Sequence, residues 1–141
     1  MPDIAMQTEA AVSPEDTYRA LTTSEGVAGW WTDRSSVTGT VGEVDRFHFP
    51  GAPASWDMRV ERAEPGTLLS WHCVGGRPQW IGTDIRWTLQ PIKNGTLILF
   101  DHEGFAEIDS LFRIVTLGWA KVILRLGAYL NTGTPDPIFT H

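Results

Sequence analysis

The chain has 141 residues, of which 42% are hydrophobic and 20% are charged. These proportions indicate one globular domain over residues 1–141 and exclude an intrinsically disordered or collagen-like chain. The formal net charge of -6 repels phosphate backbones, so no binding to nucleic acid is expected. The single cysteine, Cys73, excludes an intramolecular disulfide, and we expect it to be a small buried hydrophobic residue.

The N-terminal part of the chain predicts a strand followed by two short helices. Residues 4–12 indicate the strand, and Ser13 directly after them is a suitable helix N-cap. A second short helix begins at Ser24 and leads to the adjacent Trp30 and Trp31. We expect one of these two indoles in the core and the other at the opening of a cavity.

The middle of the chain predicts antiparallel strands, because the hydrophobic period changes to two. The clearest strands are residues 55–62, 68–73, 83–92 and 96–102. Asn94-Gly95 is typical of a tight hairpin in which both turn residues have positive φ. Beyond this turn, Leu97 and Leu99 face away from the core, so we predict a homodimer that forms through this sheet face.

The C-terminal part predicts one long helix, because the apolar period returns to 3.6 after residue 105. Asp109 is expected in its first turn, and Asn131-Thr132-Gly133 is a typical helix stop. Gly118 and Gly127 indicate a bend or a close approach to the sheet. A curved sheet and a straight helix diverge at one end, which leaves a cavity unless large side chains fill it.

Several of these segments, in this order, are typical of one family. They are Gly26-Val27-Ala28-Gly29-Trp30-Trp31-Thr32, Leu69-Ser70-Trp71, His102-Glu103-Gly104-Phe105 and Tyr129-Leu130-Asn131-Thr132-Gly133. The chain resembles the activator of Hsp90 ATPase homologue 1-like branch of the SRPBCC (START/Bet v 1-like) superfamily. The resemblance implies an α+β helix-grip fold: a curved antiparallel sheet of six to seven strands wrapped around a long C-terminal helix, with two short helices after the first strand.

The resemblance and the seven tryptophans favour binding of an apolar or aromatic small molecule, lipid-like or polyketide-like, in a cavity between sheet and C-terminal helix. The residues expected to bind it are Trp56, Met58, Trp71, Trp87, Phe100, His102, Phe112 and Trp119. We expect Trp87 to line open space and Trp119 to pack where helix and sheet are closest. Each buried indole N–H is expected to need an acceptor.

Two alternatives remain. In the first, the chain is an Hsp90-type co-chaperone or stress-related protein-interaction module, as the resemblance to the Hsp90 activator domain implies. In the second, it is a cyclase-type enzyme in which His102 performs acid-base chemistry with Asp101 or Glu103. A phosphate-binding loop and a Gly-x-Ser-x-Gly motif are missing, and the four histidines are scattered, so we expect no cofactor, no metal and neither nucleotide hydrolysis nor esterase activity. A non-enzymatic binding protein is favoured over the cyclase-type enzyme. The start of the chain lacks a secretory signal and no apolar run is long enough to span a membrane, which predicts a cytoplasmic protein.

Overall fold

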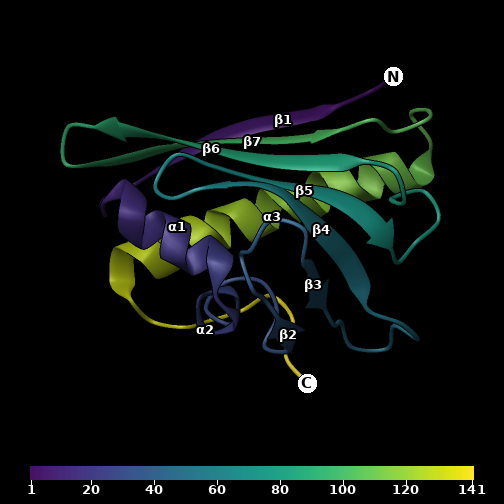
Figure 1. Cartoon of the computed structure of the whole chain (residues 1–141), viewed down its shortest axis with the longest axis horizontal. Coiled ribbons are helices and arrows are strands. Elements are labelled where there is room, and N and C mark those ends of the chain that lie inside the picture. The colour runs from purple at the N-terminus through teal and green to yellow at the C-terminus, as the bar shows by residue number, and fades with distance from the viewer.

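The seven strands form one antiparallel sheet in the order β1-β7-β6-β5-β4-β3-β2 (Figure 1), in a computed structural model that describes residues 1–141. The strands are β1 (Ile4–Ala10), β2 (Ser35–Ser36), β3 (Val44–Phe47), β4 (Trp56–Glu64), β5 (Leu68–Gly75), β6 (Asp84–Ile92) and β7 (Gly95–Glu103). The helices are α1 (Pro14–Thr22), α2 (Ser24–Val27) and α3 (Ser110–Thr132). The predicted α+β helix-grip fold is confirmed.

Helix α3 begins and ends at residues that satisfy its terminal backbone groups. The carboxylate of Asp109 accepts a hydrogen bond from the backbone N–H of Phe112 at 2.8 Å, so Asp109 is the N-cap. The sequence predicts Asp109 one position later, in the first turn of the helix. At the other end Gly133 adopts a left-handed conformation with φ of 73°, and its N–H donates to the carbonyl of Tyr129.

The hairpin between β6 and β7 differs from the prediction in one detail. Asn94 has a positive φ of 63°, but Gly95 does not, and Gly95 is the first residue of β7, paired with Ile92. The turn residues are therefore Lys93 and Asn94. Gly95 is required for a different reason, because a Cβ at this position would lie 2.1 Å from the carbonyl oxygen of Ala10 on β1.

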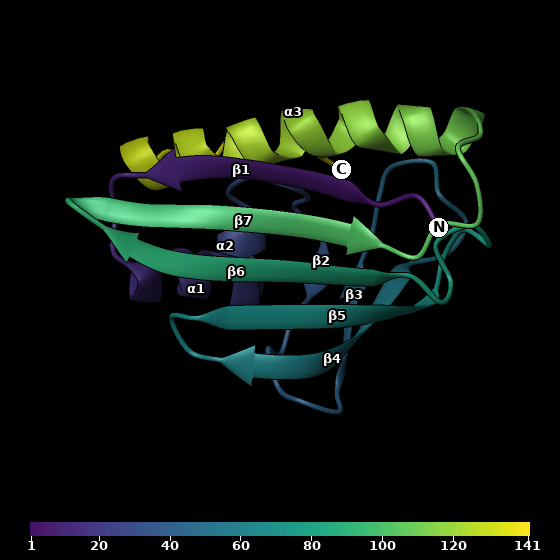
Figure 2. The same cartoon turned by 90° about the horizontal axis from the view of Figure 1, so that it is seen from above.

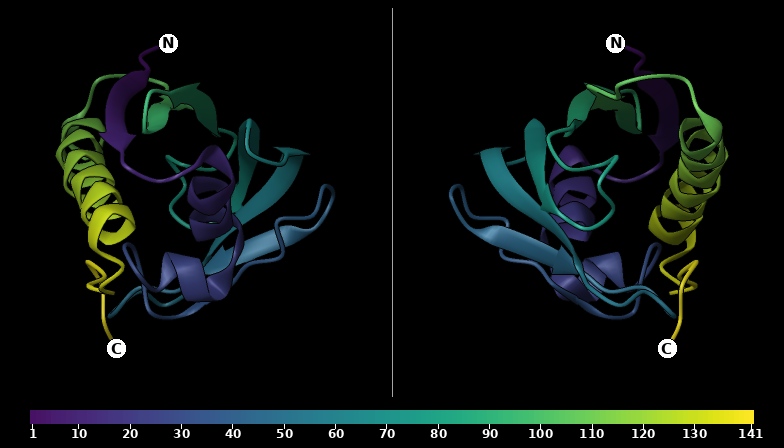
Figure 3. Two further views of the ribbon diagram at one scale, coloured as in Figure 1. Left: turned by 90° about the vertical axis from the view of Figure 1, so that its left-hand side faces the viewer. Right: turned by 90° about the vertical axis from the view of Figure 1, so that its right-hand side faces the viewer.

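The sheet curves, so that its two edges enclose the core together with the helices. Figure 2 shows α3 running along the length of β1 at one edge, and Figure 3 shows the sheet bending away from α3 toward β3 and β4, with α1 and α2 on the side of this bend. The divergence of α3 from the curved sheet opens the space in which the candidate site lies. Neither α3 nor the shorter helices combine the length and apolarity that a membrane span needs.

The two glycines of α3 have different surroundings, and neither is in unusually close contact. A Cβ on Gly127 would make an ordinary contact of 3.9 Å with Thr8, and a Cβ on Gly118 would meet no atom within 4 Å. The prediction of a close approach is therefore wrong for Gly118, which borders open space.

Candidate functional site

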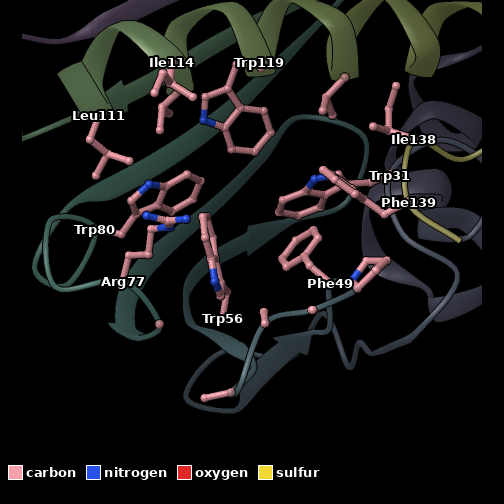
Figure 4. Close-up of a pocket in the computed structure, with 18 of the residues that line it drawn as sticks. Trp31, Phe49, Trp56, Arg77, Trp80, Leu111, Ile114, Trp119, Ile138 and Phe139 are labelled. Carbon is pink, nitrogen blue, oxygen red and sulfur yellow. The ribbon is translucent and has the colours of Figure 1, made fainter. Parts of the chain in front are cut away.

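A large pocket lies between the N-terminal half of α3, the segment 49–56 that leads into β4 and the loop 76–80 after β5. Its volume of about 780 Å³ is within the range of small-molecule sites, and it is partly open to solvent. Of its 21 lining residues, 13 are hydrophobic. Figure 4 shows their side chains converging on the pocket from α3 and from the opposite wall.

Four indole rings form much of the wall. Trp31 and Trp119 have ring centroids 5.2 Å apart, Trp119 and Trp80 5.8 Å, and Trp80 and Trp56 4.1 Å. These rings come from the chain after α2, from α3, from the loop after β5 and from the start of β4 (Figure 4). An unbroken aromatic surface of this kind offers large contact area with few rotatable bonds.

Two of the eight residues expected to bind a ligand line this pocket, Trp56 and Trp119. Five lie beneath it in the core, each no more than 1% exposed: Met58, Trp71, Trp87, Phe100 and His102. The last, Phe112, is half-buried on α3 and packs edge-on against Phe105 at 5.1 Å.

The expected role of Trp87 is wrong, whereas Trp119 is 3% exposed and packs against Phe100 of the sheet, as expected, and in addition borders the pocket. Trp87 has no exposed surface and lies edge-on behind Trp119, with the ring centroids 6.2 Å apart. Trp119 forms the layer in front of it and faces the pocket (Figure 4). Trp87 therefore fills the core, whereas Trp119 is part of the pocket wall.

His102 holds Trp119 in place by a hydrogen bond. The indole N–H of Trp119 donates to Nδ1 of His102 at 3.0 Å, and Nε2 lies 2.8 Å from the hydroxyl of Thr83. Because that hydroxyl donates its hydrogen to the carbonyl of Trp80 at 2.6 Å, it must accept from the imidazole. His102 is therefore neutral, with its hydrogen on Nε2.

The surroundings of His102 oppose acid-base chemistry. Burial lowers the pKa of its imidazole to about 3, so the side chain stays neutral at physiological pH. Asp101 and Glu103, which alternate to the other face of β7, both pair with Arg86 instead, at 3.3 and 2.6 Å. The carboxylates that the cyclase hypothesis places beside the imidazole are thus on the opposite side of the strand.

The buried indoles satisfy their N–H groups only in part. Trp30 donates to the carbonyl of Ala20 at 2.9 Å, and Trp119 donates to His102. The indole nitrogens of Trp71, Trp80 and Trp87 are buried without a partner. The expectation that every buried indole finds an acceptor is therefore wrong for these three, and Trp80 is the one among them that lines the pocket.

The adjacent tryptophans after α2 divide as expected. Trp30 has no exposed surface and lies in the core, whereas Trp31 lines the pocket. Among the lining side chains that the sequence did not indicate are Phe49, Trp80, Ile138 and Phe139. For Trp80 a signal was present, because it is the one large aromatic side chain in a loop otherwise marked by Gly and Pro.

The C-terminal segment reaches the pocket by backbone pairing. The N–H of Phe139 donates to the carbonyl of Trp31 at 2.9 Å, and the N–H of Asp136 donates to Gly29 at 3.0 Å. These bonds place Ile138 and Phe139 on the wall opposite the loop 76–80 (Figure 4). No hydrophobic period in residues 133–141 indicates this role.

No group of three or more His, Cys, Asp or Glu side chains is arranged to hold a metal ion. Cys73 is buried, and its burial raises the pKa of the thiol to about 11. The features that define the site are therefore its shape and its aromatic wall.

Comparison with known proteins gives the family. A model of the family described as "Activator of Hsp90 ATPase homolog 1-like protein" matches residues 11–131. The chain belongs to this family. The family match agrees with the resemblance in the sequence, and no curated protein matches the sequence at a significant level.

Solved structures share the fold of this family member over nearly its whole length. The Aha1 dimer of Colwellia psychrerythraea, solved in solution, is 32% identical, with a TM-score of 0.87 over 94% of this chain and 98% of that one. DynU16, a putative protein in the dynemicin biosynthetic locus, is 24% identical with a TM-score of 0.82. The match includes 99% of this chain and 51% of DynU16. Protein MLL2253 of Mesorhizobium loti is 21% identical with a TM-score of 0.79, over 92% and 96% of the two chains. The last two comparisons concern the fold alone.

Proposed function

We propose that this protein binds an apolar, aromatic small molecule in the pocket between α3 and the loops 49–56 and 76–80. The observation that carries the proposal is the wall of four tryptophans around a volume of about 780 Å³. A filled core would leave no such volume, and a site for a polar substrate would carry more polar side chains than this one. The position of DynU16 in a biosynthetic locus agrees with a small-molecule role for the fold.

In this proposal the ligand binds through contacts with the indole rings of the pocket wall. Trp119 is fixed by its hydrogen bond to His102, and Trp31 by the strand-like pairing of its backbone with Phe139. Rings held in this way lose little further conformational entropy when a ligand arrives. The two ring planes are tilted by 41°, so a ligand with a planar body packs on one ring and meets the edge of the other.

Gly118 offers a direct test, because it lines the pocket and an added Cβ would meet no atom within 4 Å. The neutral fluorophore N-phenyl-1-naphthylamine is titrated into the parent protein and into Gly118→Leu. We expect saturable binding to the parent and affinity weaker by about tenfold or more in the variant, because the leucine occupies the pocket.

The matched control is Gly118→Ala, which adds one methyl group and should keep most of the affinity while raising helix stability by up to about 1 kcal/mol. Equal binding of the fluorophore by parent and Gly118→Leu would place it elsewhere and would refute the proposed site. Absence of saturable binding to the parent would refute the proposed function. Mass spectrometry of small molecules that remain bound through gentle purification then identifies the natural ligand.

A second candidate function is protein binding through the outer face of α3, and we propose a second copy of this chain as the partner. Leu117 and Leu124 are 61% and 70% exposed, and neither lines the pocket. Their spacing of seven residues puts them on one face of the helix. The relative from Colwellia psychrerythraea is a dimer, which supports self-association of this chain.

The α3 face is favoured over the sheet face predicted from the sequence. Leu97 and Leu99 are half-buried on β7, and the residues opposite them on β1 are Glu9 and Gln7. Long polar side chains beside the leucines reduce the apolar area that a partner could cover. The homodimer through Leu97 and Leu99 remains a prediction that the same experiment tests.

Sedimentation of two double variants distinguishes these surfaces. Leu117→Asp with Leu124→Asp is expected to shift the protein to monomer, whereas Leu97→Asp with Leu99→Asp leaves the dimer. The reverse pattern would favour the sheet face, and a monomeric parent protein would refute both. Stimulation of an Hsp90 ATPase by the parent but not by the α3 variant would instead assign the face to a chaperone.

A further inference from the structure

The side chains that line the pocket contain hydrogen-bond donors and no acceptors. Six of the 21 lining residues carry a polar side-chain atom, and the other side chains are hydrocarbon or glycine. These six are Trp31, Trp56, Arg77, Trp80, Trp119 and Lys121. Indole, guanidinium and ammonium groups donate hydrogen bonds but accept none. A ligand whose own polar atoms are donors would find no side-chain partner in this pocket.

The two charged residues of the pocket are both cationic, although the whole chain carries a net charge of -6. Six other arginines have a carboxylate within 4.0 Å, whereas Arg77 and Lys121 have none. Arg77 comes from the loop after β5 and Lys121 from α3, so the two cations stand on opposing elements of the pocket. Both are exposed at its rim, and their charges are not neutralised within the protein.

Trp80 is one of the lining residues with a donor group, but it is only 3% exposed and its indole N–H is buried without a partner. In Figure 4 its nitrogen is on the side of the ring turned toward Leu111. Because the nitrogen itself is covered by protein atoms, this donor is not available to a ligand.

From the lining without acceptor side chains and the two cations without a carboxylate partner, we infer that the ligand is an aromatic molecule that carries an anionic oxygen group, such as a carboxylate, sulfonate or phenolate, held between Arg77 and Lys121. The inference rests on the proposed function, because it assumes that the pocket binds a small molecule. The aromatic body contacts the tryptophans, and the anionic group lies at the rim near both cations. Charge-assisted hydrogen bonds there give the ligand its orientation. An amine of the same size is repelled by both cations and finds no acceptor side chain.

Two fluorophores that differ by one anionic group test this inference. They are 1-anilinonaphthalene-8-sulfonate and its neutral counterpart N-phenyl-1-naphthylamine, and both are titrated into the parent protein and into Arg77→Gln with Lys121→Gln. We expect the double variant to bind the sulfonate about fivefold or more weakly, with the affinity for the neutral fluorophore unchanged. Added salt should weaken binding of the sulfonate to the parent, because screening acts on the charged contact alone.

Arg113→Gln is the matched control. Arg113 is an exposed cation of α3 that forms no ion pair and does not line the pocket. Its removal changes the net charge by one, half the change in the double variant, but should leave both affinities unchanged. An equal loss of sulfonate affinity in Arg113→Gln would mean a non-specific charge effect and would overturn the inference. So would unchanged sulfonate affinity in the double variant. If the parent bound neither fluorophore, the proposed function itself would fail, whereas binding of the neutral fluorophore alone would refute only the anionic ligand.

Discussion

Trp119 donates its indole N–H to Nδ1 of His102 across 3.0 Å, and this bond connects the wall of the pocket to the buried face of the sheet. It explains why a histidine occurs at a position without exposed surface. Protonation of His102 would place a second donor opposite the indole donor and break the contact. His102 is thus a positioning residue for the pocket, and its own titration is linked to folding.

We predict that stability falls with acidification in the range set by His102. Burial lowers its folded pKa from 6.5 to about 3, so between these values the unfolded chain binds a proton that the folded chain does not. The contribution is complete above pH 6.5 and is lost as the pH falls toward 3. Between about pH 7 and 5 this costs about 2 kcal/mol. Urea denaturation of the parent and of His102→Gln over this pH range measures the free energy of unfolding of each protein, and the variant should lack this pH dependence. The same dependence on pH in both proteins would contradict the assignment.

Trp87→Ala is expected to destabilise the protein by about 3 to 5 kcal/mol, because the side chain fills the core and contacts four other aromatic rings edge-on. Trp56→Ala removes a half-buried ring at the pocket and should cost less stability while weakening fluorophore binding. Chemical denaturation with titration of N-phenyl-1-naphthylamine measures both. A smaller loss of stability for Trp87→Ala than for Trp56→Ala would reverse the roles of these residues.

Cys73 is predicted to resist alkylation in the folded protein. Its side chain is 1% exposed, its thiol donates to the carbonyl of Gly75, and burial raises its pKa to about 11. The reactive thiolate is therefore both scarce and inaccessible at neutral pH. Mass spectrometry after treatment with iodoacetamide should show modification only when denaturant is added; rapid labelling without denaturant would contradict this packing.

Phe139→Ala should weaken fluorophore binding several-fold and cost about 1 to 2 kcal/mol of stability, because the half-buried ring packs edge-on against Phe49 at 5.0 Å and lines the pocket. The control is Thr140→Ala, an exposed neighbour in the same segment, which should change neither quantity. An unchanged affinity in Phe139→Ala would remove the C-terminal segment from the site.

Much of the fold could be predicted from local patterns. The alternation along residues 55–62 and 83–92, the apolar stripe after residue 105 and the cap at Ser13 each depend on neighbours a few residues away, and the structure contains the corresponding elements. The family could be predicted for the same reason, since its motifs lie at element ends and turns. The predicted inward face of β6 and β7 was also correct, because strand alternation assigns Trp87, Phe100 and His102 to one side of the sheet.

What alternation does not determine is whether an inward side chain meets other core atoms or an open pocket. That was decided by the curvature of the sheet, which carries β3 and β4 away from α3, and by two segments without a periodic pattern, the loop 76–80 and residues 138–139. Trp80 and Phe139 reach the wall through contacts with residues far away in the sequence. Periodic patterns in a sequence reflect local geometry, whereas a pocket is the space left between elements after they pack. The sequence therefore determined the helix-grip fold. The tertiary structure decided which tryptophans fill its core and which line its pocket.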